Sequence, residues 1–199
     1  MGQLRFMKES RKLAYLLIIA SLFASCKSEY QQYVERELNS GIKNDSLILG
    51  MYMGETKKDF FAKCWELNAQ KKISQGTGNK TARLMEDEGT KEAKMILFYG
   101  KFDKQEVMRG MDMTYTFDAW APWNLSMQSD SLLFQLKTDF LKKYPGNDFI
   151  PIEVKHSEEP AFVKIDGNRQ ILMYIKNKKD VVVTIEDLNY KLKEEWGRE

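Results

Sequence analysis

Side chains capable of chemistry are present in this chain, but they do not form a recognisable catalytic pattern. The single histidine, His156, lies in the polar segment KHSEEP, whereas metal or acid–base chemistry usually needs further His or Cys residues nearby. The sequence contains no nucleophile elbow, phosphate-binding glycine loop or zinc-type Cys/His spacing. We therefore interpret His156 as a solvated loop residue. We predict a protein that is not an enzyme, with no catalytic residue and no cofactor.

Acidic residues supply the one cluster with catalytic potential. Four carboxylates lie close together in the chain: Glu86, Asp87, Glu88 and Glu92. Paired carboxylates held a fixed distance apart in a cleft can hydrolyse glycosides, and an ordered loop of them can bind Ca²⁺. A run of acids between two strands is more typical of a solvated turn. A hydrolase with an unidentified acid pair is therefore kept as the second alternative function.

Methionine is unusually frequent, with 11 residues in the chain. Met108, Met111 and Met113 are spaced MxxMxM, and thioethers are suitable ligands for Cu(I). However, Met111 and Met113 share one face of a predicted strand, where they would pack in a core. We predict no metal site.

Aromatic residues give the clearest indication of binding. Trp120 and Trp123 flank Ala121-Pro122, and Tyr115 precedes them in a predicted strand. A tryptophan on a loop can be a rigid anchor for a protein partner or a sugar. The alternative is that both tryptophans fill a seam between two halves of the chain. Trp120, Trp123 and Tyr115 are the candidate binding residues.

The first 26 residues indicate where such a site would be located. Residues 1–12 carry four basic side chains and one acidic one, and residues 13–24 are uncharged. That apolar run is shorter than the ~20 residues needed to cross a bilayer, so residues 1–25 are interpreted as a secretory signal peptide. The end of this segment, Phe23-Ala24-Ser25-Cys26, resembles the bacterial lipobox. The resemblance implies cleavage before Cys26, lipidation of its thiol and anchoring in membrane lipid.

Removal of the leader changes the charge balance. The totals of 31 basic and 29 acidic residues fall to 27 and 28 once the leader's four basic residues and one acidic residue are gone. A near-neutral domain gives no argument for a nucleic-acid partner. With Cys26 lipidated, Cys64 is the only remaining thiol, so no internal disulfide can form.

Two segments precede the main strands. Residues 26–43 are interpreted as a membrane-proximal tether, either with a short helix that ends at Asn39-Ser40-Gly41 or as a disordered spacer. Thr56-Lys57-Lys58-Asp59 predicts a capping box at the start of a helix that runs to about Asn68. Phe60, Cys64 and Leu67 share one helix face, and Phe61 and Trp65 widen it. Cys64 is therefore predicted to be a small buried hydrophobic residue.

The remaining chain predicts strands, a second helix and more strands. Strands are expected at 80–86, 93–102 and 111–120, a helix at 129–144, strands at 150–155, 161–166, 170–177 and 181–187, and a charged tail at 191–199. Asp166-Gly167 is the clearest hairpin turn. The fold class is therefore α+β, with two α-β-β-β-type units in tandem and helices packed on antiparallel sheet. The units are expected at 44–122 and 123–199.

Three resemblances accompany this interpretation. The segment from Leu49-Gly50 to Phe60-Phe61, with Gly54, Thr56 and Lys57, is similar to the helix start of small lipoproteins of the outer-membrane β-barrel assembly machinery (SmpA type). Two helix-plus-sheet units in tandem look like the β-lactamase inhibitor protein fold. Residues 45–68 resemble part of a family of uncharacterised Bacteroidetes lipoproteins. That resemblance implies a cell-envelope location, with no known activity.

The sequence thus predicts a lipid-anchored cell-envelope protein, at the outer membrane or the periplasmic face, with a non-catalytic binding or scaffolding domain. An envelope protein is the favoured partner, and a carbohydrate or lipid bound by the aromatic loop is the first alternative. An open, twisted sheet face with exposed aromatic residues would favour the protein partner. An apolar cavity between helices and sheet would favour a lipid.

Overall fold

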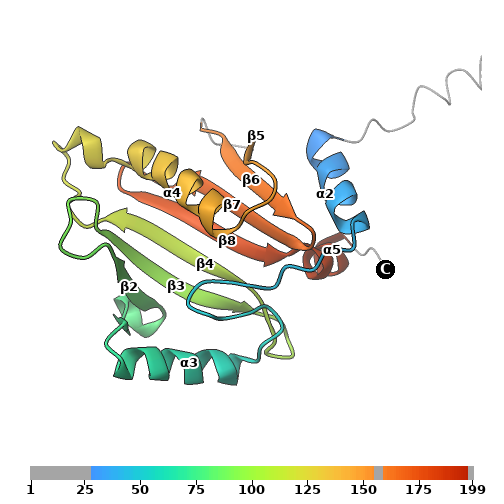
Figure 1. The fold of residues 1–199 in the computed structure, drawn as a ribbon, viewed down its shortest axis with the longest axis horizontal. Helices are drawn as coiled ribbons and strands as arrows, with labels where there is room; N and C mark the ends of the chain where they lie inside the picture. The colour runs from blue at the N-terminus through green and yellow to red at the C-terminus, as the bar shows by residue number, and fades with distance from the viewer. Residues whose placement is uncertain (1–27, 155–158, 197–199) are drawn as a thin grey trace, which may run out of the picture. The chain divides into compact units, whose positions relative to one another are not determined.

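The computed structural model describes residues 28–154 and 159–196. Its helices are α2 (Glu29–Asn39), α3 (Lys57–Ala69), α4 (Ser129–Lys143) and α5 (Leu188–Trp196), with short 3₁₀ turns η1 (Thr77–Asn79) and η2 (Leu125–Met127). Its strands are β1 (Ile73–Gln75), β2 (Ala82–Glu86), β3 (Lys94–Phe102), β4 (Met108–Phe117), β5 (Ile150–Ile152), β6 (Ala161–Asp166), β7 (Arg169–Ile175) and β8 (Asp180–Asp187) (Figure 1).

All eight strands belong to one antiparallel sheet, in the order β1-β2-β3-β4-β8-β7-β6-β5. Consecutive strands pair with one another, except that β4 and β8 meet at the centre, where Met113 lies opposite Val183. The predicted α+β class with helices on antiparallel sheet is confirmed. Residues 34–199 form one compact unit, so the predicted segments 44–122 and 123–199 share this single sheet.

Local sequence signals explain where most elements begin and end. The capping box is present: the Asp59 N–H donates to Thr56 Oγ1 (3.2 Å), and the Thr56 N–H donates to Asp59 Oδ2 (3.0 Å). The β6–β7 turn needs glycine, because Gly167 has a φ of 58° and a Cβ there would overlap the Ile42 carbonyl. Residues 26–43 contain the helix α2, which is the first of the two forms expected for the tether.

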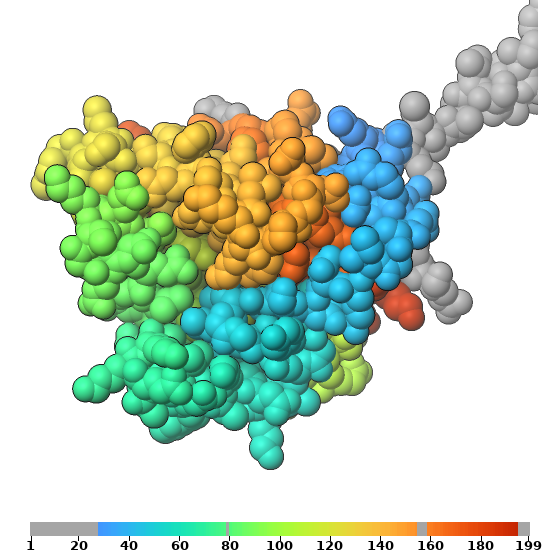
Figure 2. Space-filling view, in the orientation of Figure 1, coloured from blue at the N-terminus to red at the C-terminus, as the bar shows by residue number. Residues whose placement is uncertain are grey.

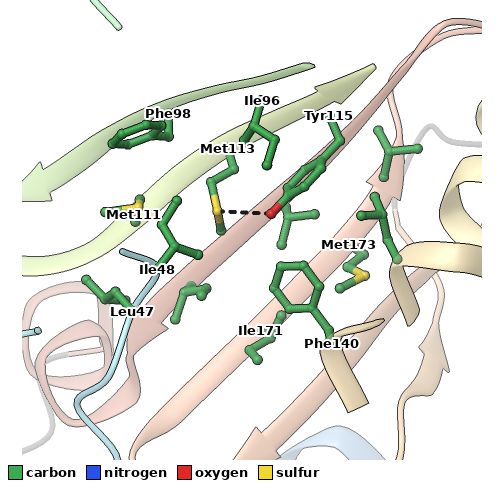
Figure 3. Packing of buried hydrophobic residues seen from close by; sticks show 14 of the residues in the cluster. Leu47, Ile48, Ile96, Phe98, Met111, Met113, Tyr115, Phe140, Ile171 and Met173 are labelled. Atoms are coloured by element: carbon green, nitrogen blue, oxygen red, sulfur yellow. Dashed lines mark hydrogen bonds between the residues drawn. The ribbon is translucent and has the colours of Figure 1, made fainter. Parts of the chain in front are cut away.

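The core lies between the sheet and the elements that cover one of its faces. Alternate residues of the central strands point to this face, including Phe98 and Met113, which are paired across β3 and β4. Phe140 of α4 and Ile48 of the segment before α3 pack against them (Figure 3). In the space-filling view, α3, α4 and this segment lie side by side on the same face (Figure 2). The predicted core position of Met111 and Met113 is confirmed, because neither side chain is more than 1% exposed.

Charged side chains are buried at the β6–β7 end of this core. Lys164, which is fully buried, donates from Nζ to the Asn147 carbonyl and to Asp166 Oδ1 (3.1 Å). The Arg169 guanidinium lies over the Tyr144 ring, 4.4 Å from its centroid, and donates to Ser46 Oγ (2.9 Å). The Arg169–Ser46 bond joins the segment between α2 and α3 to the β6–β7 hairpin, and the contacts with Tyr144 and Asn147 join the hairpin to the end of α4 and the stretch after it.

No helix in the described part of the chain is long and apolar enough to cross a membrane. The leader, with Cys26, and His156 lie outside the described residues.

Candidate functional site

A pocket of about 740 Å³ lies between α3 and the edge of the sheet formed by β1 and β2. We call it the α3 pocket. Its volume is within the range of about 300–1,000 Å³ that is usual for small-molecule sites. Its lining combines aromatic, small apolar and uncharged polar side chains with one lysine: Phe60, Phe61, Cys64, Trp65, Asn68, Ile73, Ser74, Gln75, Lys80, Thr81, Ala82 and Tyr99.

Four aromatic side chains contribute to the pocket wall. Phe60 is buried, and its ring meets those of Phe61 and Tyr99 edge-on, with both centroid distances at 5.5 Å. Phe61 is 44% exposed and Trp65 is 77% exposed, so these two rings stand at the mouth. Edge-to-face contacts hold the inner rings in place. The pocket therefore has a packed floor and an accessible apolar rim.

Cys64 lies in the same wall and is half-buried, whereas the sequence predicted a buried residue. Burial raises the pKa of its thiol to about 11, so the thiol is neutral at physiological pH. Because the thiolate is the nucleophilic form, Cys64 contributes apolar surface to the pocket rather than a reactive group.

The polar residues of the pocket have two different roles. Asn68 Nδ2 donates to the Ile73 carbonyl (3.1 Å), which ties α3 to β1. Thr81 Oγ1 is buried and has no hydrogen-bond partner among the described residues. Lys80 is the only charged residue in the lining, and in the described part of the chain no carboxylate lies within ion-pair distance of it. Besides its aromatic rings, the lining therefore offers one ammonium group and one buried hydroxyl.

The position of Tyr115 is incompatible with its predicted role as a binding residue. It is 1% exposed, its hydroxyl donates to Met113 Sδ (3.7 Å), and its ring lies 6.0 Å from that of Phe140. It is a core residue and presents no surface to a ligand. The sequence already contained a signal for this burial: residue alternation in β4 places Tyr115 on the same face as Met111 and Met113.

The two tryptophans occupy different environments. Trp120 is half-buried, and its Nε1 donates to the Lys178 carbonyl (3.2 Å), which joins the loop after β4 to the β7–β8 turn. Trp123 is 84% exposed, and nearby Leu125 is 80% exposed. Only Trp123 is therefore available as a contact anchor. The binding role of this loop remains a prediction.

The acidic cluster is partly neutralised by a lysine. Nζ of buried Lys94 donates to Asp87 Oδ2 (3.3 Å) and to Asp139 Oδ2 (3.5 Å). Glu86 is half-buried, and burial raises the pKa of its carboxyl. Glu88 and Glu92 are exposed. In the described part of the chain, no group of three or more His, Cys, Asp or Glu residues is arranged to hold a metal ion.

Sequence reasoning identified α3 but not its pocket. The width of the apolar face of α3 was a signal for the pocket. Phe61 and Trp65 make this face wider than the part that can pack against the sheet. No family model, curated protein or solved structure matches the chain.

Proposed function

We propose that this chain is a membrane-anchored, non-catalytic binding protein that holds an apolar ligand in the α3 pocket. The observation that carries the proposal is the pocket itself, with four aromatic rings and no acid–base pair in its lining. Apolar walls with a few polar groups are the usual composition of sites that bind small molecules. An apolar cavity between a helix and the sheet favours the lipid alternative over the protein partner that the sequence favoured.

The opposite face of the sheet supports this preference. Residues there alternate with the core residues and include Asp112, Thr114 and Thr184. Among the large hydrophobic residues of the described strands, only Tyr174 is exposed, at 38%. Met95, Leu97, Leu172 and Val182 on this face are partly exposed, but Asp112, Thr114 and Thr184 lie among them, so polar side chains interrupt the apolar surface.

The leader supports the anchoring part of the proposal. A basic start, a short apolar run and the Phe23–Cys26 segment are the features of a lipid-anchored envelope protein. An anchor confines the domain to the membrane surface, where the effective concentration of lipid ligands is high.

We also infer that the domain consists of two related helix-plus-sheet units. α3 precedes β1–β4, α4 precedes β5–β8, and the last strands of the two sets pair at the centre. This element order supports the proposed likeness to the SmpA type and to the β-lactamase inhibitor protein fold. Each set has four strands: β1 is additional in the first set, and the second set contains the four strands expected between residues 150 and 187.

The test is photolabelling with a neutral apolar carbene precursor, an iodophenyl trifluoromethyl diazirine. The full chain is reconstituted in phosphatidylcholine vesicles, and labelled residues are mapped by mass spectrometry. We expect labels on α3 and β1, and we expect the double variant Phe61→Ala/Trp65→Ala to lose them. The matched control is Trp123→Ala/Leu125→Ala, which also removes two exposed apolar side chains.

The second candidate function is ligand binding by the aromatic loop, and the control variant removes two side chains of that loop. Trp123 and Leu125 are the most exposed large apolar side chains of the described residues, which favours a contact surface on their loop. Labels confined to residues 118–128, with α3 unlabelled, would contradict the α3 pocket and support the aromatic loop.

A further inference from the structure

We infer that the ligand of the α3 pocket is a long-chain carboxylate, with its hydrocarbon chain along α3 and its carboxylate at Lys80. The inference rests on the proposed function, because it requires that the pocket bind an apolar ligand. Beyond the proposed function, the inference specifies the charge and the shape of that ligand.

The charge follows from the lining. Lys80 is the only ionic group among the lining residues, and the pocket contains no Asp or Glu. Lys80 is exposed and has no ion-pair partner in the described part of the chain, so its ammonium group is free to pair with a ligand. A cationic ligand would meet this like charge without a carboxylate to offset it. A single anionic group at the end of an apolar ligand is the complementary charge.

One neighbouring hydroxyl is a further candidate partner for a carboxylate. Thr81 Oγ1 is next to Lys80 in the chain, lines the pocket and has no hydrogen-bond partner among the described residues. A hydroxyl can donate one hydrogen bond, and a carboxylate only accepts. A rotation of the Thr81 side chain that turns its buried hydroxyl toward the pocket would let a ligand carboxylate accept this hydrogen bond, whereas a hydrocarbon end would leave the hydroxyl unpaired at a free-energy cost.

The shape follows from the helix. Phe61, Trp65 and Asn68 line the pocket at intervals of four and three residues, which places them in one row along α3. Seven residues of helix rise about 10 Å, so this wall is elongated. A linear chain can contact the whole row, while a single ring can contact only part of it.

The experiment compares two photoreactive chains that differ only in their end group. Diazirine-bearing hexadecanoate and the corresponding hexadecanol are added to the full chain in phosphatidylcholine vesicles at pH 8. Labelling of α3 and β1 is then quantified by mass spectrometry. We expect the carboxylate to label the pocket more strongly, and Lys80→Ala to lower its labelling about 2- to 5-fold, as for the loss of an exposed ion pair. Labelling by the alcohol is expected to remain unchanged in Lys80→Ala.

A matched control and two adverse outcomes complete the test. Lys104→Ala removes another exposed lysine, in the turn between β3 and β4, and should leave both labels unchanged. Equal labelling of the pocket by acid and alcohol, insensitive to Lys80→Ala, would overturn the carboxylate inference and leave the proposed function standing. Failure of both chains and of the neutral apolar probe to label the pocket would overturn the two together.

Discussion

At the scale of single residues, the buried charges at the β6–β7 end are the most sensitive positions. Lys164 Nζ and Asp166 Oδ2 are 2.9 Å apart, and both side chains are almost completely excluded from solvent. A buried ion pair is costly to break, because the remaining charge has no compensation. We expect Asp166→Ala to lower the free energy of unfolding by roughly 3–5 kcal/mol, measured by urea denaturation.

Asp148→Ala is the control for this prediction, since Asp148 is exposed and lies in the same region of the chain. A loss of stability in Asp166→Ala no larger than in the control would show that Lys164 does not depend on this carboxylate.

The environment of Glu186 predicts that the free energy of unfolding depends on pH. Burial acts to raise the pKa of its carboxyl, but hydrogen bonds from Lys101 and Lys191 outweigh burial and hold the pKa below its ordinary value of 4.5. The ionised form is therefore favoured in the folded state. This contribution is complete above the unfolded pKa and is lost as the pH falls through the lower folded pKa. We expect Glu186→Gln to destabilise at pH 7 and to differ progressively less from the wild type below pH about 4.5.

Urea denaturation of both proteins from pH 7 to pH 3 measures this dependence. Glu88→Gln changes an exposed residue, so its difference in stability from the wild type should not become smaller as the pH falls. A difference between Glu186→Gln and the wild type that is constant across the series would contradict the shifted pKa.

Residue types and spacing predicted the environment of some side chains correctly and of others incorrectly. Strand alternation predicted the core position of Met111 and Met113, because a period of two fixes which side chains share a face. The same rule applied to Tyr115, yet its aromatic type and its place before the tryptophans led to a binding role that its burial excludes. The environment of Lys164 depends on Asn147 and Asp166 meeting in space, which sequence spacing does not encode.

At the scale of elements, the start of α3 determines how well the pocket wall is formed. Thr56 and Asp59 satisfy each other's backbone N–H groups at this helix start. Loss of an N-cap hydroxyl typically costs about 1 kcal/mol. We expect Thr56→Ala to increase amide exchange in α3 by about fivefold, measured by hydrogen exchange with mass spectrometry.

Thr138→Ala is the comparison, since Thr138 lies on an exposed position of α4 and bonds only within its own helix. Unchanged exchange in α3 of Thr56→Ala would mean that packing, rather than the cap, determines its stability.

Most elements were predictable, because their signals are local. The capping box located α3, alternation located the longer strands, and Asp166-Gly167 located the β6–β7 turn. β1 was missed because Ile73–Gln75 is three residues long and is a strand only by pairing with β2. The α3 pocket was missed for a related reason. It forms where α3, β1, β2 and Tyr99 meet. These segments follow one another in the chain, but the pocket depends on the pairing of β1 with β2, which was not predicted.

At the scale of the whole molecule, the proposal depends on a lipid anchor at Cys26. Cys26→Ser removes the thiol that would carry the lipid. We expect the variant protein to be released from membranes or to remain unprocessed, measured by membrane fractionation and intact mass. Cys64→Ser, which removes the other cysteine, should leave both properties unchanged. Unaltered tethering and processing in Cys26→Ser would contradict the lipobox interpretation.

The single sheet explains why the pocket lies at its edge. β4 and β8 join the two sets of strands into one core, and α4 and the segment before α3 cover that core. At the end formed by β1 and β2, α3 packs on β1, and rings of α3 such as Phe61 and Trp65 stay accessible.

Alkylation of Cys64 is the most direct test of a ligand in the α3 pocket, because this thiol is part of the pocket wall. With its pKa raised to about 11, its reaction with iodoacetamide at pH 8 should already be slow. We predict that hexadecanoate slows it several-fold further in the full chain, measured on the Cys64 peptide by mass spectrometry. This protection should disappear in Phe61→Ala/Trp65→Ala and persist in Trp123→Ala/Leu125→Ala. An alkylation rate that saturating hexadecanoate does not change would contradict the account.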